Sequence, residues 1–119
     1  MMVNRHRGEV AATLDGREWV LCLTLGALAE LEAAFEAEDL TALIARFSSA
    51  RLSARDMMRI ITAGLRGGGH SVTGEDVAQM QADGGAAGFA RIVSELLTAT
   101  FGASQADTPK AESDSPSNP

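Results

Sequence analysis

The chain has 119 residues and a formal net charge of −6, so one domain is expected and nucleic-acid binding by phosphate neutralisation is disfavoured. Alanine supplies 21 residues and aromatic residues only 4%, so we expect a thin core that a partner surface could complete. No apolar run is long enough to cross a bilayer, and the N-terminus lacks the apolar segment of a signal peptide. The sequence therefore predicts a cytoplasmic protein without membrane contact.

The composition divides the chain into three parts. Residues 1–7 are polar and basic and are expected to form a flexible N-terminus. Residues 8–102 carry the patterned segments and are predicted to form a single domain. Residues 103–119 are rich in Ser, Asp, Ala and Pro and contain no large apolar residue, so they are expected to form a disordered tail. That tail has either a solubilising role or a role in recognising a partner.

The first patterned segment predicts a β-hairpin. Large apolar residues alternate before and after Asp15-Gly16, a pair that supplies the positive φ angles of a two-residue turn. Two strands are marginal in water, so one face must be covered by a helix or by another chain. The single cysteine, Cys22, is interpreted as a small buried hydrophobe. The predicted cross-strand pairs are Leu14 with Arg17, Ala12 with Trp19 and Val10 with Leu21.

A helix pattern follows the second strand without a loop. Thr24 is predicted to be the N-cap, because its side chain can accept a hydrogen bond from the first helical amides. Glutamates at positions 30, 32, 36 and 38 lie opposite the apolar stripe, with Asp39 just past the helix end and placed to cap a second helix. Nothing indicates a cleft, so these carboxylates are interpreted as a solvated face rather than a catalytic pair. The apolar stripe is Leu28, Leu31 and Phe35.

A third helix is predicted to begin at Ser53, which has Asp56 at the spacing of a capping box. Three arginines, Arg55, Arg59 and Arg66, recur at steps of four and seven residues and so lie close to one line along this helix. We expect these arginines either to meet the acidic side of the first helix, within one chain or between subunits, or to form a solvated stripe.

The remaining segments complete the predicted fold without suggesting chemistry. Gly67-Gly68-Gly69 follows a helix and lacks the lysine of a phosphate loop, so it is interpreted as a helix stop. His70 has no metal-binding constellation around it. A short helix is predicted from Thr73 to Asp83-Gly84-Gly85, and a final amphipathic helix ends at Gly102.

The fold class is therefore α+β, a β-hairpin followed by four to five short amphipathic helices. With no catalytic, metal or cofactor site recognised, an enzyme is not expected.

Several segments of the chain together carry a resemblance to a known family. They are Asn4-Arg-His-Arg-Gly-Glu-Val10, Leu21-Cys-Leu-Thr-Leu-Gly-Ala-Leu-Ala-Glu-Leu-Glu32, Arg46-Phe47, Leu52-Ser-Ala-Arg-Asp56 and Ala63-Gly-Leu-Arg-Gly67. These segments resemble the small tail assembly chaperone family of gene transfer agents of alphaproteobacteria and related prophages. The resemblance covers roughly residues 4 to 102 in order, and its most distinctive stretch is Leu23 to Glu32.

The resemblance implies a cytoplasmic, non-enzymatic chaperone that binds the tape measure protein while the tail tube assembles. The family is also described as a tail tube component, so a structural subunit of the particle is the alternative. Either reading implies contacts with other tail proteins and a homo-oligomer, without nucleic acid, membrane or cofactor. The candidate partner-binding residues are Leu28, Leu31, Phe35, Arg55, Arg59 and Arg66.

Overall fold

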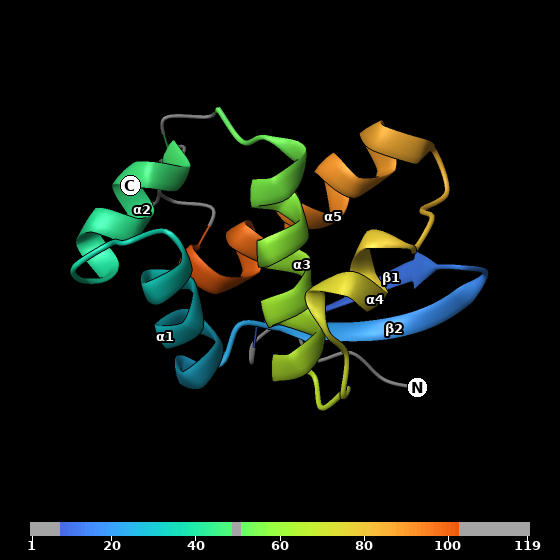
Figure 1. The fold of residues 1–119 in the computed structure, drawn as a ribbon, viewed down its shortest axis with the longest axis horizontal. Helices are drawn as coiled ribbons and strands as arrows, with labels where there is room; N and C mark the ends of the chain where they lie inside the picture. Colours follow the sequence, from blue (N-terminus) through green and yellow to red (C-terminus); the bar gives the residue numbers. More distant parts are fainter. Residues whose placement is uncertain (1–7, 49–50, 103–119) are drawn as a thin grey trace, which may run out of the picture.

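The structure, a computed structural model, describes residues 8–48 and 51–102. Within these residues an antiparallel β-hairpin is followed by five helices, which confirms the predicted α+β class (Figure 1). The predicted flexible N-terminus and disordered tail, residues 1–7 and 103–119, lie outside the described residues. The elements are β1 (Glu9–Leu14), β2 (Arg17–Cys22), α1 (Leu25–Ala34), α2 (Leu40–Ser48), α3 (Ala54–Gly67), α4 (Gly74–Ala78) and α5 (Gly85–Phe101).

The hairpin has the predicted turn and register. Asp15 and Gly16 have φ angles of 55° and 73°, as a type I′ turn requires at both central positions. The Cα partners are those predicted: Leu14 with Arg17, Ala12 with Trp19 and Val10 with Leu21. The alternating apolar side chains therefore share one face, and Trp19 also donates a hydrogen bond from its indole Nε1 to the Leu14 carbonyl, at 3.1 Å.

Helix α3 lies against the hairpin and joins it to α5 (Figure 1). Gly64 of α3 sits where Leu21 of β2 and Leu96 of α5 meet. A Cβ added at Gly64 would lie 2.7 Å from the Leu96 Cδ2 and 3.2 Å from the Leu21 Cδ2. The small residue lets three elements meet at one point, and the buried hydrophobic core extends outward from it.

The end of α3 covers the outer edge of β2. In a hairpin with a two-residue turn, the residues flanking the turn exchange hydrogen bonds, so the backbone groups of Val20 and Cys22 point away from β1. A Cβ at Gly67 would collide with the Cys22 carbonyl oxygen, and one at Gly68 with the Val20 carbonyl oxygen. The glycine run thus ends the helix, as predicted, and also permits a close backbone approach that the sequence analysis did not foresee.

Helix α1 begins as predicted but ends earlier. The Thr24 side chain accepts a hydrogen bond from the Ala27 amide, at 3.1 Å, which confirms the N-cap. The helix ends at Ala34, because Glu36 adopts a left-handed φ of 55° and the Ala37 amide bonds back to the Glu32 carbonyl at 2.9 Å. This is a Schellman ending with glutamate where glycine is usual. Residues 36 and 38, predicted to lie on the helix, therefore lie in the turn before α2.

The segment between α4 and α5 also differs from the prediction. Helix α4 ends at Ala78, and Gly84 is the N-cap of α5 rather than part of the end of α4. The intervening residues contact the hairpin turn: the Asp15 amide donates to the Gln81 carbonyl at 2.8 Å, and the Gln81 amide donates to the Asp15 Oδ1 at 2.9 Å. The tip of the hairpin is thereby attached to a loop 66 residues later in the chain.

Candidate interaction surface

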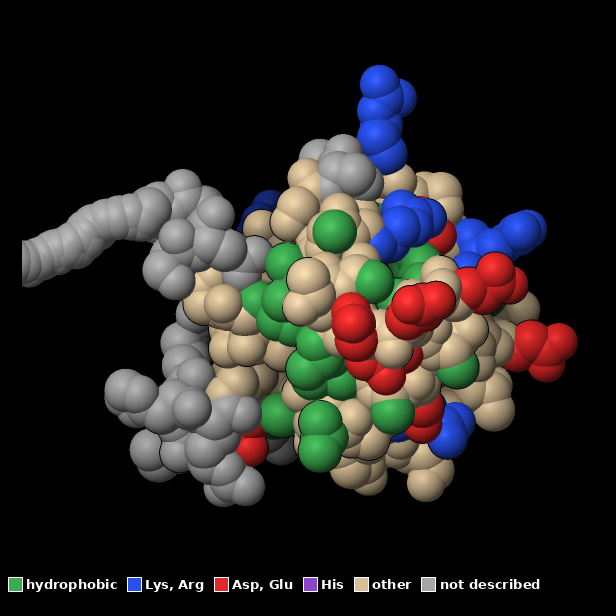
Figure 2. All heavy atoms as spheres, turned by 90° about the vertical axis from the view of Figure 1, so that its left-hand side faces the viewer, with side chains coloured by type: hydrophobic (Ala, Val, Ile, Leu, Met, Phe, Trp, Pro, Cys, Tyr) green, Lys and Arg blue, Asp and Glu red, His purple; other side chains and the backbone are tan. Residues whose placement is uncertain are grey.

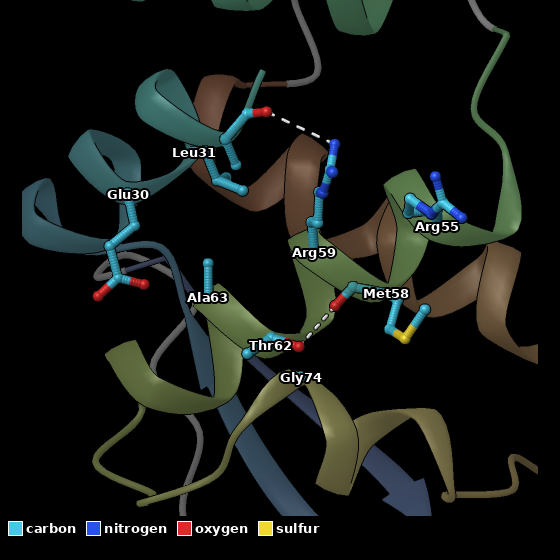
Figure 3. Close-up of a pocket in the computed structure, with 9 residues that line it drawn as sticks. Glu30, Leu31, Arg55, Met58, Arg59, Thr62, Ala63 and Gly74 are labelled. Carbon is cyan, nitrogen blue, oxygen red and sulfur yellow. Dashed lines mark hydrogen bonds between the residues drawn. The ribbon is translucent and has the colours of Figure 1, made fainter. Parts of the chain in front are cut away.

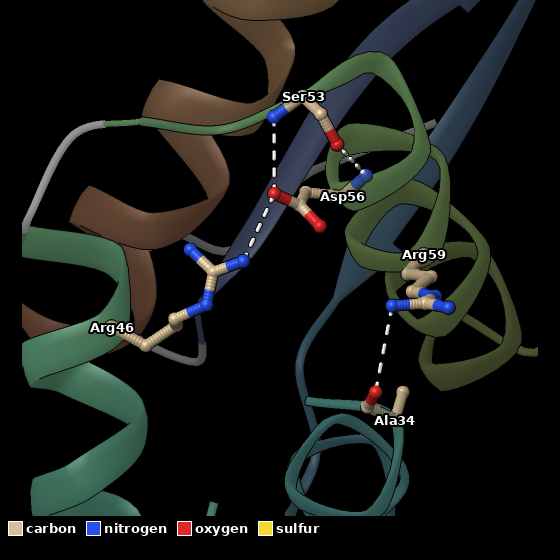
Figure 4. Close-up of polar contacts among 5 residues, drawn as sticks. All are labelled: Ala34, Arg46, Ser53, Asp56 and Arg59. Carbon is tan, nitrogen blue, oxygen red and sulfur yellow. Dashed lines mark hydrogen bonds and ion pairs between the residues drawn. The ribbon is translucent and has the colours of Figure 1, made fainter. Parts of the chain in front are cut away.

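Helices α1 and α3 run antiparallel, and two of the predicted arginines connect them. Arg66, near the end of α3, places its Nε 3.5 Å from the Oε2 of Glu30 in the middle of α1. Arg59, two turns earlier, donates from Nη1 to the Ala34 carbonyl at the end of α1, at 3.5 Å (Figure 4). Arg66 and Glu30 are both about half exposed, at 50% and 49% of their side chains, so this ion pair contributes little to stability.

The third arginine of the row has no carboxylate partner. Arg55 is exposed and forms no ion pair within the described residues. Arg59 is also exposed and contacts a backbone oxygen rather than an acid. Within one chain, the predicted contact between the arginine row and the acidic side of the first helix is therefore made by Arg66 alone. Two positive charges remain available at the surface.

An open apolar groove lies between α1, α3 and the start of α4. Its volume is about 290 Å³, and Leu31, Ala34 and Met58 supply apolar atoms to its lining. Figure 3 shows Glu30 and Arg55 at opposite ends of this groove, with Arg59 between them. The groove therefore offers apolar contact along its length, together with two guanidinium groups, those of Arg55 and Arg59, that form no ion pair within the described residues.

A buried carboxylate fixes the corner where α2 meets α3. Asp56 is only 7% exposed. It accepts a hydrogen bond from the Ser53 amide at 3.0 Å, and its Oδ2 lies 3.2 Å from the Nη2 of Arg46 (Figure 4). The hydrogen bond from the Ser53 backbone, together with the Arg46 charge, lowers the pKa of Asp56 below its ordinary value despite burial. The predicted capping box is confirmed, with the Ser53 side chain accepting from the Asp56 amide.

Phe35 lies next to this corner between two arginines. The guanidinium carbons of Arg46 and Arg59 are 5.3 Å and 5.7 Å from the centre of its ring. Its ring also meets that of Phe47 edge to face, with centroids 5.4 Å apart. Phe35 is half-buried and packs against the core, and the two cation–π contacts involve the part of it that stays near the surface.

The candidate residues thus fall into two groups. Leu28 and Leu31 are 8% and 1% exposed and belong to the core, although Leu31 also reaches the groove wall. Phe35 and the three arginines lie at the surface around the groove. Sequence reasoning did not identify Met58 as part of the groove or Arg46 as a contact of Phe35 and Asp56. A helical stripe alone does not indicate which half-buried residues a neighbouring helix leaves uncovered.

Sequence reasoning also missed the most exposed large hydrophobic residue. Leu25, the first residue of α1, is 77% exposed, whereas the only other one in the described chain, Leu40, is 37% exposed. Its position three residues before Leu28 gives no signal of exposure, because that spacing is the same as the spacing of a buried helical stripe.

The remaining candidates for chemistry are metal-ligating side chains and His70. No group of three or more His, Cys, Asp or Glu side chains is placed there to hold a metal ion. His70 packs edge to face on Trp19, with ring centroids 4.9 Å apart, and its buried Nε2 has no hydrogen-bond partner in this part of the chain. None of the described helices combines the length and apolarity that crossing a bilayer requires.

Comparison with known protein families identifies a matching family. The profile of the family described as "Phage tail tube protein, GTA-gp10" matches residues 7–103 of this chain. No curated protein and no solved structure matches it.

Proposed function

Because that profile covers residues 7–103 of 119, the chain belongs to the phage tail tube protein family GTA-gp10, and we propose that it is a structural subunit of the tail of a gene transfer agent or phage. The resemblance found in the sequence is confirmed as far as a gene transfer agent or phage tail protein. The family description names the tail tube, so it supports the structural alternative better than the chaperone reading.

The observation that carries this proposal is the extent of the match. It includes every described helix and strand, from β1 to α5, rather than one motif within a larger fold. The surface around the α1/α3 groove is consistent with a subunit that contacts other tail proteins, because apolar atoms lie there beside arginines that form no ion pair within the described residues.

A chaperone for the tape measure protein is the second candidate, and the same groove favours it. An open apolar groove of about 290 Å³ could shelter the apolar stripe of a helix before the tube encloses it. Both candidates are non-enzymatic and without a cofactor, and both begin in the cytoplasm. They differ in whether the chain stays in the finished particle.

Quantitative mass spectrometry of purified particles and of the cytosol separates the two. A structural subunit is expected in the particles at a fixed ratio to the other tail proteins. A chaperone is expected to be absent from particles and to copurify with the tape measure protein from cytosol. Absence from particles would overturn the structural proposal.

A further inference from the structure

Helix α1 presents an apolar side chain to solvent on one flank and borders the groove on the other. With 100° between successive helical residues, Leu25, Ala29 and Glu32 project from one flank of α1. Glu30 and Ala34 project from the opposite flank and line the groove. The buried stripe of Ala27, Leu28 and Leu31 lies between these flanks. We call the first flank, Leu25 with Ala29 and Glu32, the α1 ridge.

The charges beside the ridge and beside the groove are opposite. The ridge leads into the α1–α2 turn, where carboxylates form no ion pair within the described residues. Figure 2, which faces the α1 and α2 side, shows acidic side chains gathered beside hydrophobic ones. The groove instead carries Arg55 and Arg59, and its one lining carboxylate, Glu30, already pairs with Arg66. The carboxylates along the ridge and turn are Glu32, Glu36, Glu38 and Asp39.

We propose that the groove binds a second copy of this chain, with Leu25 of one copy inserted between α1 and α3 of the next. The ridge supplies an exposed apolar side chain followed by acids, and the groove supplies apolar walls followed by arginines. In one orientation, the leucine therefore meets the apolar walls while the acids meet the arginines. Glu32 lies two turns, about 10 Å, beyond Leu25 along the ridge and would approach the arginine end of the groove. This inference rests on the proposed structural role in the tail.

The two surfaces lie on opposite flanks of the same helix, which determines the kind of assembly. A contact between different surfaces of two copies is head-to-tail, and each added copy presents a new groove or ridge. Such contacts produce rings where the rotation closes and filaments where it does not. The expected assembly is therefore larger than a dimer.

The test uses the full chain and analytical ultracentrifugation over a range of concentrations. The wild type should assemble beyond two copies. Leu25→Asp removes the inserted side chain and Arg59→Glu reverses a groove charge, so each should weaken association by at least about tenfold. Leu40→Asp is the matched control, because it changes the other exposed leucine outside the proposed contact and should assemble like wild type. Circular dichroism and thermal unfolding check that each variant folds.

Mixing the two variants tests the head-to-tail geometry. Leu25→Asp keeps an intact groove and Arg59→Glu keeps an intact ridge, so an equimolar mixture should form a dimer that stops at two copies. A second pair, Arg59→Glu combined with Glu32→Arg in one chain, should regain part of the association that either reversal alone loses. A wild type that stays monomeric, a Leu25→Asp chain that assembles normally, or a mixture without dimers would each overturn the inference. A monomeric wild type would point instead to a helix of another tail protein in the groove.

The outcome for this inference is separate from the outcome for the proposed function. If the chain is found in particles but Leu25→Asp assembles normally in solution, the inference fails and the structural role stands. If the chain is absent from particles but the ridge and groove variants lose assembly, the structural role fails while the contact between copies stands.

Discussion

The two sides of α3 have opposite characters. On one side, Gly67 and Gly68 bring the end of the helix so close to the β2 backbone that no Cβ fits, and Gly64 leaves room for the side chains of Leu21 and Leu96. On the other side, Arg55 and Arg59 border an open groove that the described chain does not fill. On the closed side, close backbone contacts leave no room for a different packing. On the open side, Arg55 and Arg59 form no ion pair within the described residues, and apolar atoms of the groove face solvent. The comparison suggests that the closed side specifies the fold and the open side is available for a partner.

The strongest test of the closed side is Gly67→Ala. The added methyl group would overlap the Cys22 carbonyl oxygen, so the end of α3 must move away from the edge of β2. We expect the free energy of unfolding to fall by about 3 kcal/mol. Urea unfolding followed by circular dichroism measures this loss.

The matched control for that substitution is Gly26→Ala in the first turn of α1. The nearest atom to its new Cβ would be the Thr24 Oγ1, at 3.9 Å, which is an ordinary contact. Because alanine favours the helix over glycine, this control should gain about 0.5 kcal/mol. A Gly67→Ala chain as stable as wild type would show that the close approach is not required.

The next test concerns Asp56, where α2 meets the first turn of α3. Asp56→Asn keeps the shape and one acceptor oxygen but removes the charge that faces Arg46. We expect a loss of about 1 to 2 kcal/mol at neutral pH. Thermal and urea unfolding at pH 7 give the value, with Asp39→Asn, an exposed N-cap of α2, as the control that should lose less.

The same variant tests the pH dependence of stability. The folded protein lowers the pKa of Asp56 below its ordinary value of 3.8, so the carboxylate stabilises the fold fully above that value. As the pH falls through the lowered pKa, this contribution is lost. The stability difference between wild type and Asp56→Asn should therefore be largest at neutral pH and shrink toward pH 2. A difference that stays constant with pH would mean that the charge of Asp56 does not stabilise the fold.

Local patterns predicted most of the fold, and contacts between distant segments account for what they missed. The hairpin register follows from Asp15-Gly16, and the N-caps at Thr24 and Ser53 follow from side-chain chemistry within four residues. The end of α1 was misplaced because Glu36 adopts the left-handed φ of a Schellman ending, a position where the sequence carries no glycine to indicate it.

The candidate site was predicted less completely than the fold, for the same reason. The arginine row was recognised from its spacing, but spacing does not tell which arginine finds a carboxylate. Only Arg66 does so among the described residues of the row. The groove itself exists because small side chains, such as Ala34 and Ala63, leave space between two helices. The sequence shows that these residues are small, but it does not show which residues of the neighbouring helix lie opposite them.

A third test addresses the left-handed residue at the open side. Glu36 has a φ of 55°, a conformation that costs a residue with a Cβ about 1 kcal/mol but suits glycine. Glu36→Gly should therefore raise the free energy of unfolding by about 0.5 kcal/mol after the greater flexibility of the unfolded chain is included. Ala33→Gly, inside the same helix, is the control and should lose about 1 kcal/mol. Equal losses in both variants would contradict the assigned helix ending.

The smallest effect is expected for the ion pair between Glu30 and Arg66, and it tests the open side directly. Both side chains are about half exposed, so water and salt screen their attraction. Arg66 also donates to the Val72 carbonyl at 3.4 Å, a contact that the substitution Glu30→Gln leaves in place. This variant should lose less than about 0.5 kcal/mol in low salt and nothing measurable in 1 M salt. A loss above about 1 kcal/mol that persists in high salt would mean that the open side also holds the fold together. In that case a partner that bound Glu30 or Arg66 in place of this ion pair would weaken the domain.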